Sequence, residues 1–158
     1  MNGGAQSNVN FDTSEIAAWY DADQGLIDKK IFVDPKIYAL EQQRIFARAW
    51  HFMCHESHVP NTGDYFINHI GQDPVIVARD DHGQVQVMLN NCSHRGNVLC
   101  RAEMGNTHSF QCSYHGWNFT LDGKLKSVPG HEPFYRGKLN KDCWGLTHAA
   151  KVEQYKGF

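Results

Sequence analysis

Short apolar segments alternate with polar turns along most of the chain beyond residue 50. Six of these segments are rich in β-branched and aromatic residues: YFINHI, PVIVAR, VQVMLN, SFQC, WNFT and LKSV. The stretches DDHG (80–83) and LDG (121–123) are typical of hairpin turns. Many short strands at close spacing predict a small antiparallel β domain that runs from about Trp50 to the end of the chain.

A helix is predicted before this region. Asp34 is a good N-cap and Pro35 suits the first helical turn. Apolar residues follow at roughly helical spacing: Ile37, Leu40, Ile45 and Phe46. We therefore expect a helix from about Pro35 to Arg48, and short helical turns within residues 14–30.

The two patterns divide the chain into two expected parts. Residues 1–49 form an N-terminal arm and helix, and residues 50–158 form the β domain. The opening MNGGAQSNVN is polar and rich in Gly and Asn, so we expect it to be disordered or an extended arm. The closing VEQYKGF resembles the start of another strand. We expect the chain to be truncated there, with a natural terminal strand as the alternative.

Composition excludes several classes of partner. The 158 residues are 41% hydrophobic and 20% charged with a net charge of −2, which gives no reason to expect nucleic acid or an anionic membrane as a partner. No apolar run is long enough to span a membrane, and the opening residues lack the pattern of a signal peptide. We expect a cytoplasmic protein, in which Cys and His at fixed spacing indicate a metal site more often than a disulfide.

Two short stretches, NCSHRG (91–96) and CSYHGW (112–117), each carry one Cys and one His beside a Gly. We call their four candidate ligands the Cys/His quartet: Cys92, His94, Cys112 and His115. Seventeen residues separate the first His from the second Cys. A single Cys-x-His would be read as a buried thiol and an ordinary polar residue. Two such pairs between neighbouring strands predict a metal centre.

The mixture of ligands bears on which metal is bound. Two thiolates and two imidazoles suit tetrahedral zinc, but common zinc modules keep like ligands together along the sequence. A two-iron, two-sulfide cluster uses such a mixture, with both thiolates on one iron and both imidazoles on the other. Neutral imidazoles make that cluster less negative than an all-Cys cluster, so it accepts an electron more readily.

Residues beside the quartet suggest how such a centre would be tuned. Gly96 and Gly116 would let the backbone approach the cluster and aim N–H groups at its sulfur atoms. Trp117 would shield one side of it, or else serve as an ordinary aromatic residue of the core. The hydroxyls of Ser113 and Tyr114 would donate hydrogen bonds to sulfur.

The spacing Cys-x-His-x₁₇-Cys-x₂-His resembles the Rieske [2Fe–2S] motif. More closely, the chain is similar over about residues 25–158 to the N-terminal domain of the α subunit of bacterial aromatic ring-hydroxylating dioxygenases of the naphthalene, biphenyl and polycyclic-aromatic type. The supporting stretches are IFARAWHFMCHESHVPNTGDYF, DPVIVARDDHGQVQVMLNNCSHRG and SYHGWNFTLDGKL. Respiratory Rieske proteins carry an extra Cys in each loop, and here Asn97 and Tyr114 offer no such pair, which implies a lower-potential, oxygenase-type cluster.

This resemblance implies a mainly β fold, a small antiparallel Rieske-type β-sandwich with an N-terminal helical arm. It implies a [2Fe–2S] cluster held by Cys92 and Cys112 on one iron and by His94 and His115 on the other. The cluster would take electrons from a ferredoxin or reductase and pass them to a mononuclear non-haem Fe(II). That iron cis-dihydroxylates aromatic rings with O₂, using electrons that come ultimately from NAD(P)H.

The resemblance also implies partners and limits. Other α subunits and a small β subunit are expected, and no nucleic acid or membrane. The mononuclear iron belongs to a C-terminal domain that we expect to lie beyond Phe158. No catalytic residue is therefore expected in this chain, and the chain alone is not expected to be an oxygenase.

Two other functions stay open from the sequence: a stand-alone Rieske ferredoxin that only carries electrons, and a structural zinc-binding module. The stretch HFMCHESH also spaces three His residues, at positions 51, 55 and 58, in the manner of a helical metal face, although it does not match His-Glu-x-x-His. A strand is the simpler interpretation there. The remaining candidates are interpreted as a loop residue, His108, and as buried or free thiols, Cys54, Cys100 and Cys143.

Overall fold

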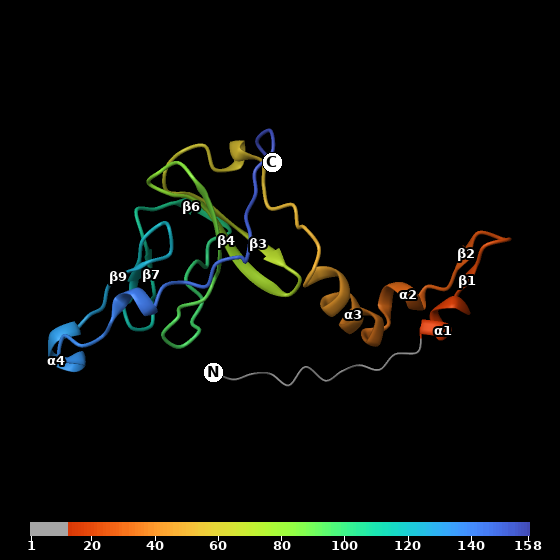
Figure 1. Cartoon of the computed structure of the whole chain (residues 1–158), viewed down its shortest axis with the longest axis horizontal. Coiled ribbons are helices and arrows are strands. Elements are labelled where there is room, and N and C mark those ends of the chain that lie inside the picture. Colours follow the sequence, from red (N-terminus) through yellow and green to blue (C-terminus); the bar gives the residue numbers. More distant parts are fainter. Residues whose placement is uncertain (1–12) are drawn as a thin grey trace. The chain divides into compact units, whose positions relative to one another are not determined.

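The computed structural model describes residues 13–158 and divides the chain into two compact units (Figure 1). The first unit ends at His51, and the second runs from Phe52 to Phe158. The expectation for the first ten residues lies outside the described part of the chain. Among residues 13–158, no helix combines the length and the apolar character that crossing a bilayer requires.

The first unit consists of short helices and one small hairpin. Its elements are α1 (Thr13–Ala17), β1 (Tyr20–Asp21), β2 (Leu26–Ile27), α2 (Lys30–Val33), α3 (Pro35–Glu41) and the π-helical turn η1 (Gln42–Phe46). The predicted helix is present as α3 and η1. The Asp34 side chain caps it by accepting a hydrogen bond from the Lys36 N–H at 2.8 Å. Its buried residues are Ile37 and Leu40.

The helical turns expected within residues 14–30 are only partly correct. Between α1 and α2 the chain forms an antiparallel hairpin instead, in which Tyr20 pairs with Ile27 and Asp21 pairs with Leu26. The Asp21 carboxylate accepts a hydrogen bond from the Gln24 N–H at 3.0 Å, which closes the turn. Asp side chains favour such turns because they bond to backbone N–H groups a few residues ahead.

The second unit contains two antiparallel sheets. The first has the order β5-β4-β3-β6 and comprises β3 (Asp64–Ile70), β4 (Asp73–Arg79), β5 (Val85–Leu89) and β6 (Met104–Asn106). The second has the order β7-β8-β9 and comprises β7 (Phe110–Gln111), β8 (Asn118–Phe119) and β9 (Leu125–Ser127). Short helical turns complete the unit: η2 (Glu56–His58), α4 (His131–Tyr135) and η3 (Lys141–Cys143). The mainly β, antiparallel fold predicted from the sequence is confirmed.

The six strand segments named first lie in these sheets, and both predicted turns are present. The strands expected in HFMCHESH and in VEQYKGF are wrong: residues 50–55 and 151–158 form no strand. The Gly83 N–H donates to the Asp80 carbonyl in one turn, and the Gly123 N–H donates to the Thr120 carbonyl in the other. The strand β6, which carries the sequence Met-Gly-Asn, and the helical turns α4 and η3 were not predicted, because none of them has a repeating apolar pattern.

Strand β4 separates two apolar clusters because its successive side chains point to opposite faces of the sheet. Ile76 and Ala78 face a cluster that contains Phe110, Trp117 and Phe119 of the second sheet region. The cluster on the other face includes Val75, Val77, Val87, Val59 and Cys54. The first cluster joins the two sheets, and it also includes both Cys residues of the quartet.

Candidate metal centre

The first quartet loop, residues 92–97, follows β5 and is held at its base by a buried amide. The Asn90 side chain, 3% exposed, accepts from the backbone N–H of Leu99 and of Cys100 at 3.2 and 2.9 Å. Its amide nitrogen donates to the Cys100 carbonyl at 2.8 Å. The Asn90 side chain therefore holds the start of the loop against its end at Leu99 and Cys100, which sets the width of the loop.

Within the first loop, two backbone hydrogen bonds define a tight turn. The Gly96 N–H donates to the Cys92 carbonyl at 2.7 Å, and the Cys92 N–H donates to the Asn97 carbonyl at 2.8 Å. Gly96 has φ +70°, a left-handed conformation that side chains disfavour. The turn presents the Cys92 sulfur and the His94 ring from one short segment.

The second quartet loop, residues 112–117, joins β7 to β8 and repeats the same turn. The Gly116 N–H donates to the Cys112 carbonyl at 2.9 Å, and the Cys112 N–H donates to the Trp117 carbonyl at 2.8 Å. Gly116 has φ +73°. The two loops therefore share one backbone turn and differ in whether His follows Cys by two residues or by three. The approach of this backbone to a bound cluster stays a prediction.

The two thiols lie together in the interior. Cys92 and Cys112 are each 2% exposed and are hydrogen-bonded to each other. Burial raises the pKa of the Cys92 thiol. Burial also acts to raise the pKa of Cys112, but the backbone N–H groups of Tyr114 and His115, followed by the Cys92 thiol, outweigh it and hold that pKa below its usual value. The pair therefore favours thiolate character at Cys112, the form that binds metal.

A side chain of the first loop reaches the sulfur of the second. The Asn97 amide nitrogen lies 3.6 Å from the Cys112 sulfur, 3.3 Å from the Ser113 hydroxyl and 3.0 Å from the Val98 carbonyl, and it donates to all three. Sequence reasoning missed this donor, and the signal available was only a polar residue directly after the loop Gly. The hydroxyl-to-sulfur hydrogen bonds expected of Ser113 and Tyr114 stay a prediction.

The two imidazoles of the quartet also lie together. The ring centroids of His94 and His115 are 4.7 Å apart, with the rings nearly perpendicular. The Nδ1 atom of His94 is buried and has no hydrogen-bond partner within residues 13–158. Burial, and then the proximity of His115 and Arg95, lowers the pKa of His94, so its ring is neutral at physiological pH. A buried ring nitrogen without a hydrogen-bond partner is unusual. A metal ion bound to the lone pair of this nitrogen would supply the missing partner.

Aromatic rings enclose the imidazoles. Trp117 is 2% exposed and stacks on His94 with centroids 4.5 Å apart and planes 7° apart. The sequence left open whether Trp117 shields the site or belongs to the core. It belongs to the core cluster, and the shielding of a bound cluster stays a prediction. Tyr114 lies over His115 at 3.8 Å and is 62% exposed. One imidazole is therefore covered from the core and the other by a surface ring.

The other candidates do not join the quartet. His55 and His58 cap η2, where each ring bonds to neighbouring backbone groups. His51 ends the first unit, and His108 is exposed between β6 and β7. In the part of the chain that the structure describes, no three or more His, Cys, Asp or Glu side chains converge on one point as ligands of a single ion. The quartet instead offers two sulfurs in contact and two rings in contact, which suits two metals that each take a like pair.

Comparison with known proteins connects this geometry to a family. The family model described as "Rieske [2Fe-2S] domain" matches residues 49–155. The biphenyl 2,3-dioxygenase subunit alpha of Rhodococcus jostii (strain RHA1) is 45% identical over 144 residues, which cover 91% of this chain and 31% of that protein. The benzene 1,2-dioxygenase subunit alpha of Pseudomonas putida is 43% identical over 148 residues, covering 94% and 32%.

A solved structure agrees with the sequence relatives. The naphthalene 1,2-dioxygenase from Rhodococcus sp. bound to indole superposes with a TM-score of 0.80 at 36% sequence identity, over 99% of this chain and 34% of that one. The chain thus spans about a third of the length of the relatives that it matches.

Proposed function

Because this chain belongs to the Rieske [2Fe–2S] domain family, we propose that it is the electron-transfer part of an aromatic ring-hydroxylating dioxygenase. The observation that carries the proposal is the pairing of like ligands, with two thiols in contact on one side and two imidazoles in contact on the other. The N-terminal arm and helix would occupy residues 1–49, and the Rieske domain residues 50–158. The match over residues 49–155 supports this boundary.

In this proposal the quartet holds the cluster. Cys92 and Cys112 would bind one iron through sulfur, and His94 and His115 would bind the other through ring nitrogen. A bound cluster of this type takes up and releases one electron at a time. The Nδ1 of His94, which has no hydrogen-bond partner within residues 13–158, and the lowered pKa of Cys112 fit these roles, because imidazole must be neutral and thiol deprotonated to bind metal.

The surrounding residues hold the ligands in place and offset charge. Backbone N–H groups of His94 and Arg95 donate to the Cys92 sulfur, and those of Tyr114 and His115 donate to the Cys112 sulfur. Each donor stabilises negative charge on sulfur. Trp117 excludes water from one face of His94. Water is thus excluded from the cysteine side of the centre, and the two half-buried histidines face the protein surface.

The wider reaction follows from the relatives, whose names describe dioxygenases of biphenyl and benzene. We propose that a ferredoxin or reductase supplies electrons derived from NAD(P)H. They would pass to a mononuclear non-haem Fe(II) that cis-dihydroxylates an aromatic hydrocarbon with O₂. That iron would be held by residues outside this chain, in an assembly with other α subunits and a small β subunit. A cytoplasmic location would keep the free thiols reduced.

The two alternatives are not favoured. The matching family model describes a [2Fe–2S] domain rather than a zinc module. The relatives compared above are dioxygenase α subunits rather than small ferredoxins.

Cluster assembly tests the proposal directly. After anaerobic reconstitution, the purified chain should contain iron and acid-labile sulfide and give a rhombic EPR signal when it is reduced. Cys112→Ala should abolish this signal. Cys143→Ala, which removes an exposed free thiol, should retain it.

A ligand exchange is a sharper test of the quartet. His94→Cys should keep a cluster at a lower potential, because thiolate adds negative charge. The shift should run from the Rieske range towards the value of about −400 mV found for all-Cys plant-type clusters. An unchanged potential in an assembled His94→Cys cluster would refute the ligand assignment.

A further inference from the structure

The segment from α4 to η3 lies against the aromatic wall of the candidate metal centre. Tyr135 and Trp144 both contact the Trp117 ring edge-on, with centroids 6.5 and 5.5 Å away. The Ser93 hydroxyl of the first quartet loop donates to the Trp144 carbonyl at 2.6 Å. Trp144 is therefore fixed both to the first loop and to the residue that stacks on His94.

These contacts form a continuous line of rings from the surface to the quartet. Trp144 is 36% exposed, Trp117 is buried, and Trp117 stacks on His94 at 4.5 Å. Electron tunnelling weakens steeply across gaps and less steeply through packed atoms. An electron delivered at Trp144 would therefore cross only packed rings before it reaches a proposed iron ligand.

The chain around Trp144 is basic although the whole protein is not. Between Leu121 and Gly145 there are five Lys and Arg residues and three Asp and Glu residues, in a chain of net charge −2. The Lys141 ammonium donates to the Lys126 carbonyl at 3.2 Å, which places these two residues together. Lys141 begins the η3 turn, and the Trp144 N–H donates to the Lys141 carbonyl at 3.0 Å where that turn ends.

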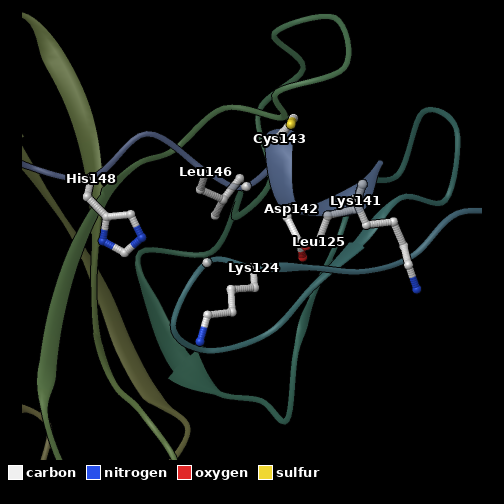
Figure 2. Close-up of a pocket in the computed structure, with 9 residues that line it drawn as sticks. Lys124, Leu125, Lys141, Asp142, Cys143, Leu146 and His148 are labelled. Atoms are coloured by element: carbon white, nitrogen blue, oxygen red, sulfur yellow. The ribbon is translucent and has the colours of Figure 1, made fainter. Parts of the chain in front are cut away.

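A pocket of about 280 Å³ lies beside η3 and continues this basic surface (Figure 2). Lys124, Lys141 and His148 are among its lining residues. Figure 2 shows the two lysines on either side of Asp142 and Leu125. Lys124 is paired with Asp122 at 2.7 Å, which leaves Lys141 of the pocket lining, and Lys126 beside it, for contact with a partner.

We propose that Lys126, Lys141 and Trp144 form the docking surface for an acidic one-electron donor protein, and that its electron reaches the quartet through Trp144 and Trp117. This inference rests on the function proposed above. The donor, a reduced [2Fe–2S] ferredoxin, would lose one electron, and a cluster held by the quartet would gain it. The tryptophan rings are not oxidised, because they serve only as the packed medium for tunnelling.

The positive charge of Lys126 and Lys141 favours an electron-donor protein that binds this surface by diffusion. A protein that must find its partner by diffusion gains from electrostatic steering, and transient electron-transfer complexes have small interfaces. A lysine pair beside one exposed aromatic ring suits such an encounter with an acidic partner.

Stopped-flow reduction of the reconstituted chain by an acidic plant-type [2Fe–2S] ferredoxin tests the docking. At low ionic strength, Lys126→Glu and Lys141→Glu should each lower the second-order rate constant about tenfold, the lower end of steering effects. The difference should shrink at high salt. The charge control Lys156→Glu and reduction of every variant by dithionite should match the unmodified chain. Equal ferredoxin rates in all variants would overturn the proposal.

A binding measurement separates docking from electron transfer. Calorimetric titration of the same ferredoxin into the metal-free chain should show weaker, salt-sensitive binding for Lys141→Glu and unchanged binding for Lys156→Glu. Equal affinities for these two variants would place the docking surface elsewhere.

The aromatic route has its own test. Trp144→Leu should lower the limiting first-order rate of reduction at saturating ferredoxin, and Trp144→Phe should restore much of it, while both keep the cluster absorbance. The control Tyr155→Leu removes another exposed ring and should have no effect. An unchanged limiting rate in Trp144→Leu would overturn the route. Absence of a cluster spectrum in the unmodified chain would instead overturn the proposed function.

Discussion

The amide of Asn97 is expected to raise the reduction potential of the cluster. It donates to the Cys112 sulfur at 3.6 Å from the opposite loop. Reduction adds one negative charge to the cluster, and a donor to sulfur stabilises that charge. Asn97→Leu keeps a side chain of similar size and removes the N–H groups, so the reduced form should lose stability and the potential should fall.

The size of the fall follows from the contacts of this amide. A hydrogen bond to a charged acceptor is worth about 1 kcal/mol more than one to a neutral acceptor, and this corresponds to about 40 mV for one electron. The two N–H groups of Asn97 are shared with the Ser113 hydroxyl and the Val98 carbonyl. We therefore expect Asn97→Leu to lower the potential by about 20–40 mV.

A redox titration followed by EPR or visible circular dichroism measures this difference. Ser93→Ala is the matched control, because it removes a hydrogen bond of the same loop that goes to the Trp144 carbonyl and not to sulfur. Its potential should match that of the unmodified chain. If Asn97→Leu assembles its cluster with an unchanged or a higher potential, the amide does not stabilise the reduced state and this reasoning is wrong.

Two further predictions concern stability and protonation. Gly96 and Gly116 both have a left-handed φ, so replacing either with Ala should cost about 1–2 kcal/mol of folding stability. Only the new Cβ at position 116 would also lie close to a neighbour, 2.9 Å from the Pro129 side chain. Gly116→Ala should therefore lower the urea midpoint more, and equal midpoints would contradict this. The side-chain amide of Asn106 lowers the pKa of Asp64, so this stabilisation is present above about pH 3.9 and is lost as the pH falls through the lowered pKa. Asn106→Ala should raise the Asp64 pKa in an NMR titration, and no change would exclude this bond as its cause.

Local sequence patterns were sufficient for most strands and for the predicted helix. In the six strand segments, β-branched and aromatic residues alternate with polar ones or occur together. This pattern reflects which side chains face the interior. The capped start of α3 follows from Asp34 and Pro35, which act on the backbone within one turn. Such features depend on neighbours in the sequence and can be read from it.

The elements that were missed depend on contacts with distant residues. The helical turn α4 has five residues, ends at Arg136 in a left-handed conformation and contains no buried residue. Its Tyr135 ring packs against Trp117, which is far away in the sequence. Asn97 likewise gains its role only because the second loop lies opposite the first.

The sequence by itself determined the residue types and the spacing of the quartet, and through them the chemistry of a mixed thiolate and imidazole centre. It also determined the shared turn, because each loop places Gly four residues after its Cys. Only the tertiary structure brought the two loops together, since one follows a strand of the first sheet and the other joins two strands of the second. Packing in this unit leaves Nδ1 of His94 without a hydrogen-bond partner among residues 13–158 and places Trp144 against Trp117. These consequences come from long-range packing, which no local pattern encodes.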